Sequence, residues 1–171
     1  PFTDNHYYRK PRIRELSLAV IQDQIRHAHR DGSNDDFYPF EKAVGSTAFT
    51  LYAMAETAHI LKITDDQTIK FLERRARWLA IRQESGHLTN HHALVALGLG
   101  AVHRLTGSPD LNEYRIKVRD SILGWQSEEG WFPEYEGFDP GYHTFTISFL
   151  AYLRAITGDD TLSSPLYRAI D

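Results

Sequence analysis

Polar side chains suited to acid-base chemistry and anion binding gather at two points of the sequence. Asn90, His91 and His92 come just before one long apolar stretch, and Tyr142 and His143 come just before another. Amides and imidazoles can donate hydrogen bonds to a carboxylate, whereas an imidazole or a phenol can move a proton. In the first turn of a helix, unpaired backbone N–H groups add attraction for an anion and help to keep an imidazole neutral as a base. The sequence therefore predicts a site for a carboxylate or a sulfate.

A structural role for the same residues stays open. Asn90 is of a residue type that caps helices, and either histidine can be a satisfied polar group beneath a loop. A zinc site is not expected from His87, His91 and His92, because neighbouring helical residues point about 100 degrees apart. We predict no bound metal and no cofactor. The chain has neither a phosphate-binding glycine loop nor a G-x-S-x-G motif, which argues against the commonest nucleotide-binding and serine-hydrolase motifs.

Two connecting segments, residues 35–41 and 131–138, are unusually aromatic and acidic. Aromatic faces beside polar groups suit sugar rings, so Tyr38, Trp131, Glu134 and Tyr135 are predicted to contact a carbohydrate. Trp131 also fits a role in covering the end of the domain. A glycosidase pair can be drawn from residues in this region, namely Glu134, Glu136 and Asp139.

The composition narrows the possible partners. The formal charge of −4, with basic residues scattered among acids, gives no attraction for nucleic acid. No run of apolar residues is long enough to span a membrane, so we expect a soluble protein without a membrane partner. The absence of cysteine leaves the compartment open between cytoplasm and periplasm.

The elements that must position these residues form a repeat of helix pairs. Three apolar stretches cover residues 47–63, 93–105 and 144–156. Each is followed by a similar short polar segment, which begins at Thr64, Thr106 or Thr157. Continuous hydrophobicity predicts inner helices that are buried on most faces. Apolar residues spaced by three and four predict one-sided outer helices over 11–30, 69–79 and 111–125, with a further helix beginning near Ser163.

Local chemistry predicts where these helices begin and end. Thr64 with Gln67 fits a capping box, and Ser108 and Asp139 each precede a proline at a first helical position. Gly86 fits a helix terminator. If the pairs are stacked in order, three long polar loops and the starts of the inner helices share one rim.

The latter half of the chain resembles the helical domain of heparinase II/III-like polysaccharide lyases. Three motifs carry the resemblance: Asn90-His91, Gly130-Trp131-Phe132-Pro133-Glu134-Tyr135 and Asp139-Pro140-Gly141-Tyr142. The segment 38–52 is also similar to this group. The resemblance implies β-elimination at a uronic acid, in which Asn90 and His91 neutralise the substrate carboxylate and Tyr142 acts as acid or acid and base. It places His92, Tyr135 and His143 beside them.

These observations together predict an all-α fold, a full or partial α/α toroid of about three outer and inner helix hairpins. We expect residues 1–171 to form one helical domain that is a piece of a larger toroid. Such lyases close their cleft with a β-sandwich, for which this chain has no strand pattern, so a homo-oligomer or a missing domain is expected to cover the open end. The predicted partner is an anionic polysaccharide or oligosaccharide. A helical repeat that only binds glycan or protein, or another toroid enzyme such as a glycosidase or epimerase, remains an alternative.

Overall fold

The computed structural model of the chain describes residues 4–82, 84 and 86–170. Within this part the fold is all-α, with no strand beyond one isolated bridge between Glu134 and Gly137. The elements are α1 (Pro11–His27), α2 (Val44–Leu61), α3 (Asp66–Ala80), α4 (Thr89–Thr106), α5 (Pro109–Trp125), α6 (Pro140–Thr157), the 3₁₀ turn η1 (Asp160–Leu162) and α7 (Ser163–Arg168). The predicted all-α class is therefore confirmed. None of the described helices is long and apolar enough to cross a membrane.

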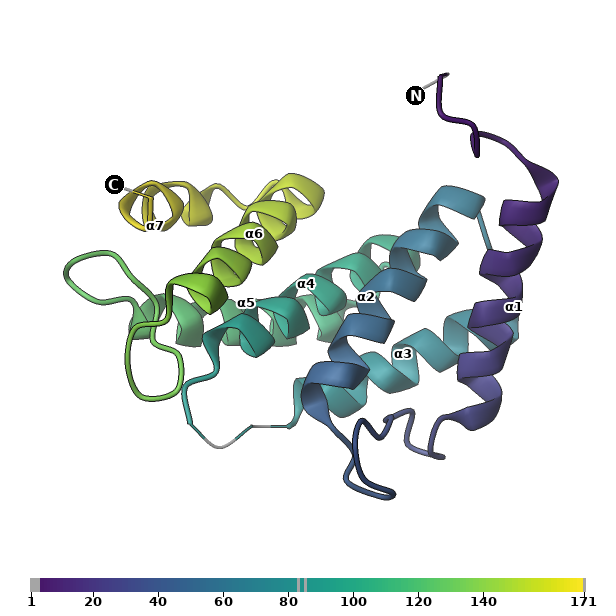
Figure 1. Ribbon diagram of the computed structural model, residues 1–171, viewed down its shortest axis with the longest axis horizontal. Coiled ribbons are helices and arrows are strands. Elements are labelled where there is room, and N and C mark those ends of the chain that lie inside the picture. Colours follow the sequence, from purple (N-terminus) through teal and green to yellow (C-terminus); the bar gives the residue numbers. More distant parts are fainter. Residues whose placement is uncertain (1–3, 83, 85, 171) are drawn as a thin grey trace.

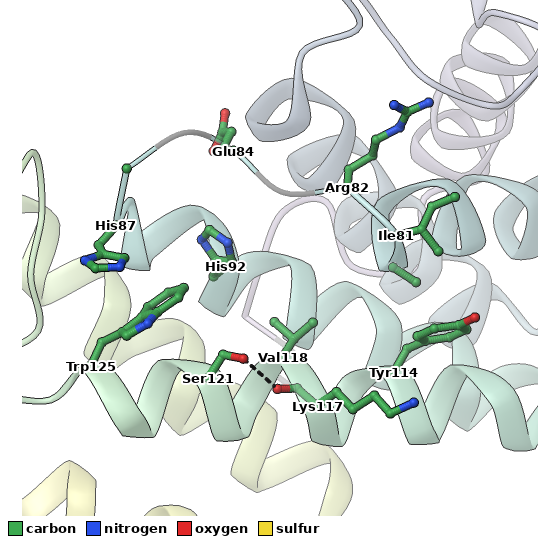
Figure 2. A pocket seen from close by; sticks show the side chains of 12 residues that line it. Ile81, Arg82, Glu84, His87, His92, Tyr114, Lys117, Val118, Ser121 and Trp125 are labelled. Carbon is green, nitrogen blue, oxygen red and sulfur yellow. Dashed lines mark hydrogen bonds between the residues drawn. The ribbon is translucent and has the colours of Figure 1, made fainter.

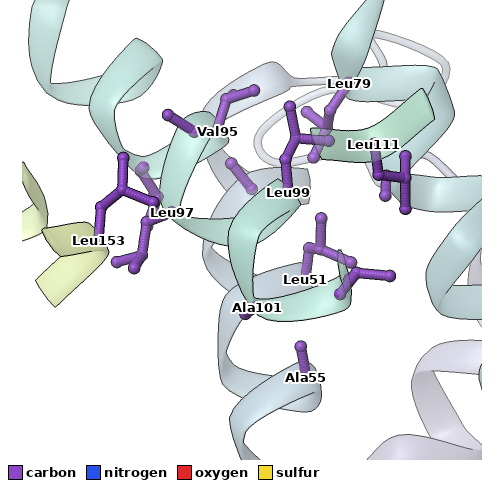
Figure 3. Close-up of a cluster of buried hydrophobic side chains, with 14 of the residues drawn as sticks. Leu51, Ala55, Leu79, Val95, Leu97, Leu99, Ala101, Leu111 and Leu153 are labelled. Carbon is purple, nitrogen blue, oxygen red and sulfur yellow. The ribbon is translucent and has the colours of Figure 1, made fainter. Parts of the chain in front are cut away.

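Helix α4 lies at the centre of the core and packs against α2, α3, α5 and α6. Small residues allow this close approach: a Cβ added to Gly98 would lie 3.1 Å from a methyl of Leu51, and one added to Gly100 would lie 2.9 Å from a methyl of Leu153. Figure 3 shows Leu51, Leu97, Leu99 and Leu153 in the resulting cluster. The prediction of burial on most faces is thus correct for α4.

The same prediction is wrong for α2 and α6, each of which leaves one face uncovered. Only four residues of α6 are buried, His143, Thr146, Leu150 and Leu153, and they form a stripe at spacings of three and four. Aromatic side chains occupy exposed positions of α2 and α6 instead. An apolar sequence cannot distinguish a helix that is buried all round from one whose apolar face awaits a ligand or a partner.

The observed helix ends confirm some of the predicted helix boundaries. Asp139 caps α6 by accepting a hydrogen bond from the backbone N–H of Tyr142 at 2.9 Å. Asp65, rather than Thr64, caps α3, because its carboxylate accepts from the Thr68 N–H at 2.9 Å. Helix α3 ends at Ala80, so Gly86 is not its terminator. Ser108 stands at the N-cap position of α5 without capping it through its side chain.

The long connections that precede α2, α4 and α6 lie along one edge of the molecule (Figure 1). The short connections that follow these three helices lie at the other end. Buried Arg75 of α3 ties the first long connection down by donating to the Gly32 carbonyl, the Asn34 side chain and the Thr50 hydroxyl, each at 2.6 Å. Burial lowers the pKa of Arg75 to about 10, so the guanidinium stays charged at neutral pH. The starts of α2, α4 and α6 therefore share the predicted rim.

Candidate functional site

A buried carboxylate organises the rim between α4 and α6. Glu134 is 1% exposed and accepts hydrogen bonds from the backbone N–H of Asn90 at 2.7 Å, from the Asn90 side-chain amide at 2.9 Å and from the Thr146 hydroxyl at 3.0 Å. The loop is held a second time where the Thr89 hydroxyl donates to the Pro133 carbonyl at 2.5 Å. Glu134 thus caps the first turn of α4 from another segment and fixes the loop that follows α5.

The hydrogen bonds to Glu134 determine where the side-chain amide of Asn90 points. Its side chain is 4% exposed, and its amide points to Glu134 rather than to solvent. Contact between that amide and a ligand would require the loop to move. In the structure Asn90 therefore positions the loop.

His143 and Trp131 make contacts within the protein that hold the rim in place. His143 is buried: Nδ1 accepts from the Phe132 N–H at 3.3 Å, and Nε2 donates to the Ala169 carbonyl at 3.0 Å. The Trp131 indole donates to Glu129 at 3.0 Å, and its ring packs near Phe138. Both ring nitrogens of His143 are occupied, so its contribution to a ligand is indirect.

A tight turn places the rings of Tyr135 and Tyr142 beside each other on the rim. Glu134 and Gly137 exchange backbone hydrogen bonds at 2.7 and 3.0 Å, and the residues between them, Tyr135 and Glu136, have φ of 51° and 66°. This is the geometry of a type I′ turn, which costs energy at residues other than glycine. Such strain persists where the surroundings hold the backbone in place, and buried Glu134 does so here.

The tip residue Tyr135 is 62% exposed, and its ring lies 5.3 Å from that of Tyr142, which is 38% exposed. The hydrogen bond with Tyr142 raises the pKa of Tyr135, and burial and the charges of Glu134 and Glu84 act in the same direction. The raised pKa favours the protonated form of Tyr135.

His91 lines a cavity of about 450 Å³ on the other side of the first turn of α4. Its Nδ1 lies 2.6 Å from a carboxylate oxygen of Glu84, and its ring packs on Gly45, where an added Cβ would come within 2.9 Å of Cε1. Phe37 and Phe49 contribute aromatic surface to the same cavity. The first turn of α2, which needs a glycine at this point, thus forms one wall.

The partnership with Glu84 makes His91 a cation over a wider range of pH. The hydrogen bond to Glu84 raises the pKa of His91 above 6.5, burial opposes the rise, and the charges of Glu84 and Glu134 support it. The stability that this pair contributes is therefore fully present below pH 6.5 and is lost as the pH rises through the folded-state pKa.

Replacing Glu84 by Gln is expected to lower the pKa of His91, because the amide removes the negative charge and the charge-assisted hydrogen bond. NMR titration of the imidazole resonances measures this change directly. Glu128→Gln, an exposed change in another rim loop, should leave the titration of His91 as in the wild type. An unchanged pKa in Glu84→Gln would show that the two side chains are not paired in solution.

The remaining predicted residues are placed as follows. His92 donates from Nδ1 to the Leu88 carbonyl at 3.0 Å and faces Trp125, away from the His91 cavity. Tyr38 is exposed on the first rim loop. The His91 cavity, as far as its lining is described, contains neither Asn90 nor Tyr142. The structure thus joins Asn90 to Glu134 and Tyr135 to Tyr142, and it leaves His91 in a neighbouring pocket.

A row of exposed and partly buried rings connects that pocket to the tyrosine pair. Phe49 of α2 lies 5.9 Å from Phe149 of α6, and Phe149 stacks on Phe145 at 5.9 Å. Phe145 is 51% exposed and lies one helical turn from Tyr142. We call Phe49, Phe149, Phe145 and Tyr142 the aromatic row.

The sequence analysis identified Tyr142 but missed the three phenylalanines of the aromatic row, Glu84 and Gly45. The signal for the row was present, since Tyr142, Phe145, Phe149 and Tyr152 recur at spacings of three and four on α6. Because the stretch 144–156 is apolar throughout, its sequence predicts core positions for Phe145, Phe149 and Tyr152. Glu84 and Gly45 carry no signal in the sequence that links them to His91.

The arrangement offers hydroxyl, imidazole and aromatic groups rather than a metal centre. In the ranges that the structure describes, no group of three or more His, Cys, Asp or Glu side chains is placed to hold a metal ion. No protein-family model, curated protein or solved structure matches the chain.

Proposed function

We propose that this chain is the sugar-binding helical part of a polysaccharide-lyase-like protein, an arc of an α/α toroid that binds a uronic-acid-containing polysaccharide along its rim. The observation that carries the proposal is the aromatic row, which runs from the His91 pocket to the tyrosine pair. A monomeric protein rarely leaves so many large rings uncovered without a binding role. Flat rings of this kind stack on the apolar faces of successive sugars.

The ends of the aromatic row supply complementary polar groups. At one end His91, whose pKa Glu84 raises, faces a cavity where its imidazole can take a sugar carboxylate. Asp36 and Glu41 also line that cavity and suit the hydroxyls of the same sugar. At the other end Tyr135 and Tyr142 present hydroxyls to solvent. The surface therefore fits a sugar that carries both hydroxyl and carboxylate groups.

The tyrosine pair supports β-elimination as the reaction. In this reaction Tyr142 acts as its phenolate beside Tyr135 and takes the proton from C5 of the uronic acid as the C4–O bond breaks. The electrons of the C–H bond form the C4=C5 double bond, and the same proton returns from Tyr142 to the leaving oxygen. Neutralising the carboxylate makes the C5 proton more acidic, which is the role that His91 would have. Asn90 would act through Glu134 as a positioning residue.

The burial of Asn90 favours a second candidate, in which the chain binds the polysaccharide without cleaving it. The Asn90 amide, one of the two predicted neutralising groups, is hydrogen-bonded within the protein. A domain that only binds would need the aromatic row and not the proton transfer. Ultraviolet absorbance of an unsaturated uronide separates the two candidates, because elimination creates that chromophore and binding does not.

Replacing Phe145 by Ala is expected to weaken binding of oligomers of galacturonic acid on the order of fivefold to tenfold, because stacking on one exposed ring is worth about 1 kcal/mol. Isothermal titration calorimetry measures the affinity. Tyr167→Ala removes an exposed ring of α7 outside the row and serves as the matched control. Equal affinities of the wild type and Phe145→Ala would remove the support that the aromatic row gives to this function.

A further inference from the structure

The segment before α2 forms one wall of the His91 pocket. Asp36, Phe37 and Glu41 of this segment line the cavity of about 450 Å³ together with Phe49 and His91. The Phe37 side chain is 83% exposed, the largest exposed fraction among the large apolar side chains that the structure describes. An uncovered ring at the wall of a cavity gains hydrophobic free energy when a ligand covers it. Phe37 is therefore placed to contact a molecule in the His91 pocket.

The rings of the neighbouring cavity, of about 560 Å³, are in contact with one another instead (Figure 2). There the imidazoles of His87 and His92 each lie 4.8 Å from the ring of Trp125. Within residues 4–82, 84 and 86–170, no other ring packs against Phe37. The Phe37 ring thus keeps its faces for a ligand, whereas Trp125 is already covered by imidazoles.

Glu41 fixes the backbone that carries this ring. Its Oε1 accepts hydrogen bonds from the backbone N–H groups of Asp36 and Phe37, the second at 2.5 Å. Hydrogen bonds from two successive amides to one carboxylate oxygen are charge-assisted and stronger than those to a neutral acceptor. The position of the Phe37 main chain at the pocket therefore depends on the Glu41 side chain.

Asp35 holds the rest of the segment in the same way. Its carboxylate accepts from the backbone N–H of Phe40 at 2.9 Å and of Lys42 at 3.1 Å, and from Nε2 of His29 at 2.7 Å. Phe40 and Lys42 have φ of 66° and 52°, in the left-handed region that is unfavourable for residues other than glycine. Strain of this kind persists where the surroundings over-determine the backbone. The wall is thus built before a ligand binds, so little ordering of the loop opposes binding.

We infer that Phe37 stacks on the sugar whose carboxylate His91 takes, and that Glu41 is the positioning residue that holds Phe37 at the pocket. The inference rests on the proposed function, because it adds a second ring to the place where the first sugar binds. Phe49 lies on α2 and Phe37 on the loop before it, so the sugar is contacted from two different elements. The apolar face of a pyranose supplies the surface that such a ring covers.

Replacing Phe37 by Ala is expected to weaken binding of oligomers of galacturonic acid on the order of fivefold to tenfold, measured by isothermal titration calorimetry. Phe40→Ala is the matched control. Phe40 belongs to the same loop and is 82% exposed, but it is not in the described lining of the His91 pocket. Its replacement should leave the affinity as in the wild type.

The role of Glu41 is tested by a double-mutant cycle with Phe37. Glu41→Ala should also weaken binding, and the loss in the double variant should be well below the product of the two single losses, because one residue acts through the other. Glu41→Gln keeps an oxygen that accepts both backbone N–H bonds, so its affinity should lie within about twofold of the wild type. A merely structural role of Glu41 would not produce this coupling.

The outcomes separate this inference from the function on which it rests. Unchanged binding in Phe37→Ala, with binding still weakened by Phe145→Ala, overturns the inference and leaves the aromatic row in place. Equal weakening by Phe37→Ala and Phe40→Ala also overturns it, since contact within the pocket would then not explain the loss. Single losses that simply multiply in the double variant overturn the positioning role of Glu41. Binding that responds to neither Phe145→Ala nor Phe37→Ala overturns both proposals.

Discussion

Replacing Tyr142 by Phe is expected to lower the rate of unsaturated uronide formation on the order of a hundredfold or more, because it removes the group that carries the proton. The ring and its contact with Tyr135 are kept, so the aromatic row and the fold should be preserved. The rate is followed by ultraviolet absorbance with polygalacturonate as substrate. Circular dichroism reports whether thermal unfolding is unchanged, as expected for a side chain that is partly exposed.

Tyr152→Phe provides the matched control for this experiment. Tyr152 lies on the same exposed face of α6, three turns beyond Tyr142, and loses the same hydroxyl without touching Tyr135. A rate equal to the wild type in both variants would exclude Tyr142 as the proton carrier. Absence of uronide from the wild type, with oligomer binding intact, would instead establish the binding-only candidate.

Replacing Glu134 by Ala is expected to lower the free energy of unfolding by about 3 kcal/mol, because three buried donors lose a charged acceptor. For a chain of this length the change corresponds to a fall in melting temperature of roughly 6 to 12 °C. The effect should be concentrated in the 131–138 loop and the first turn of α4, where hydrogen exchange should accelerate. Urea denaturation gives the free energy, and exchange gives the location.

Glu136→Ala tests the specificity of that effect. Glu136 occupies the other central position of the same turn, is exposed, and shares the positive φ of Tyr135. Its replacement should change the free energy of unfolding by less than about 0.5 kcal/mol. Equal losses in the two variants would mean that the turn itself, rather than the buried carboxylate, determines the stability of the rim.

The helical elements could be predicted because their signals are local. The apolar stretch before Thr106 specifies helix α4, and the Asp139-Pro140 pair specifies the start of α6, so each signal lies within the element that it predicts. Burial could not be predicted with the same success, since α4 and α6 have similar apolar composition but different surroundings. Whether a ring such as Phe145 is covered depends on which other helices are present, and its own sequence does not contain that information.

The site was predictable in its residue types and not in its pairings. Asn90 and Glu134 are 44 positions apart, and no local pattern indicates that one amide and one carboxylate will meet. The same holds for Gly45, which makes room for His91 only after α2 and α4 have packed. Long-range contacts of this kind decide which polar groups face a ligand and which support the fold.

The measurement that tests the proposed function most directly is NMR titration of the chain with a uniform oligomer of galacturonic acid, with backbone and aromatic resonances assigned. Saturable shifts are expected for His91 and along the aromatic row, at Phe49, Phe149, Phe145 and Tyr142, with small shifts at the short returns near Thr64 and Gly107. Equal concentrations of a neutral glucose oligomer should produce weaker shifts. No saturable shift along the row, or shifts confined to another surface, would contradict the proposal that this rim binds a uronic-acid polysaccharide.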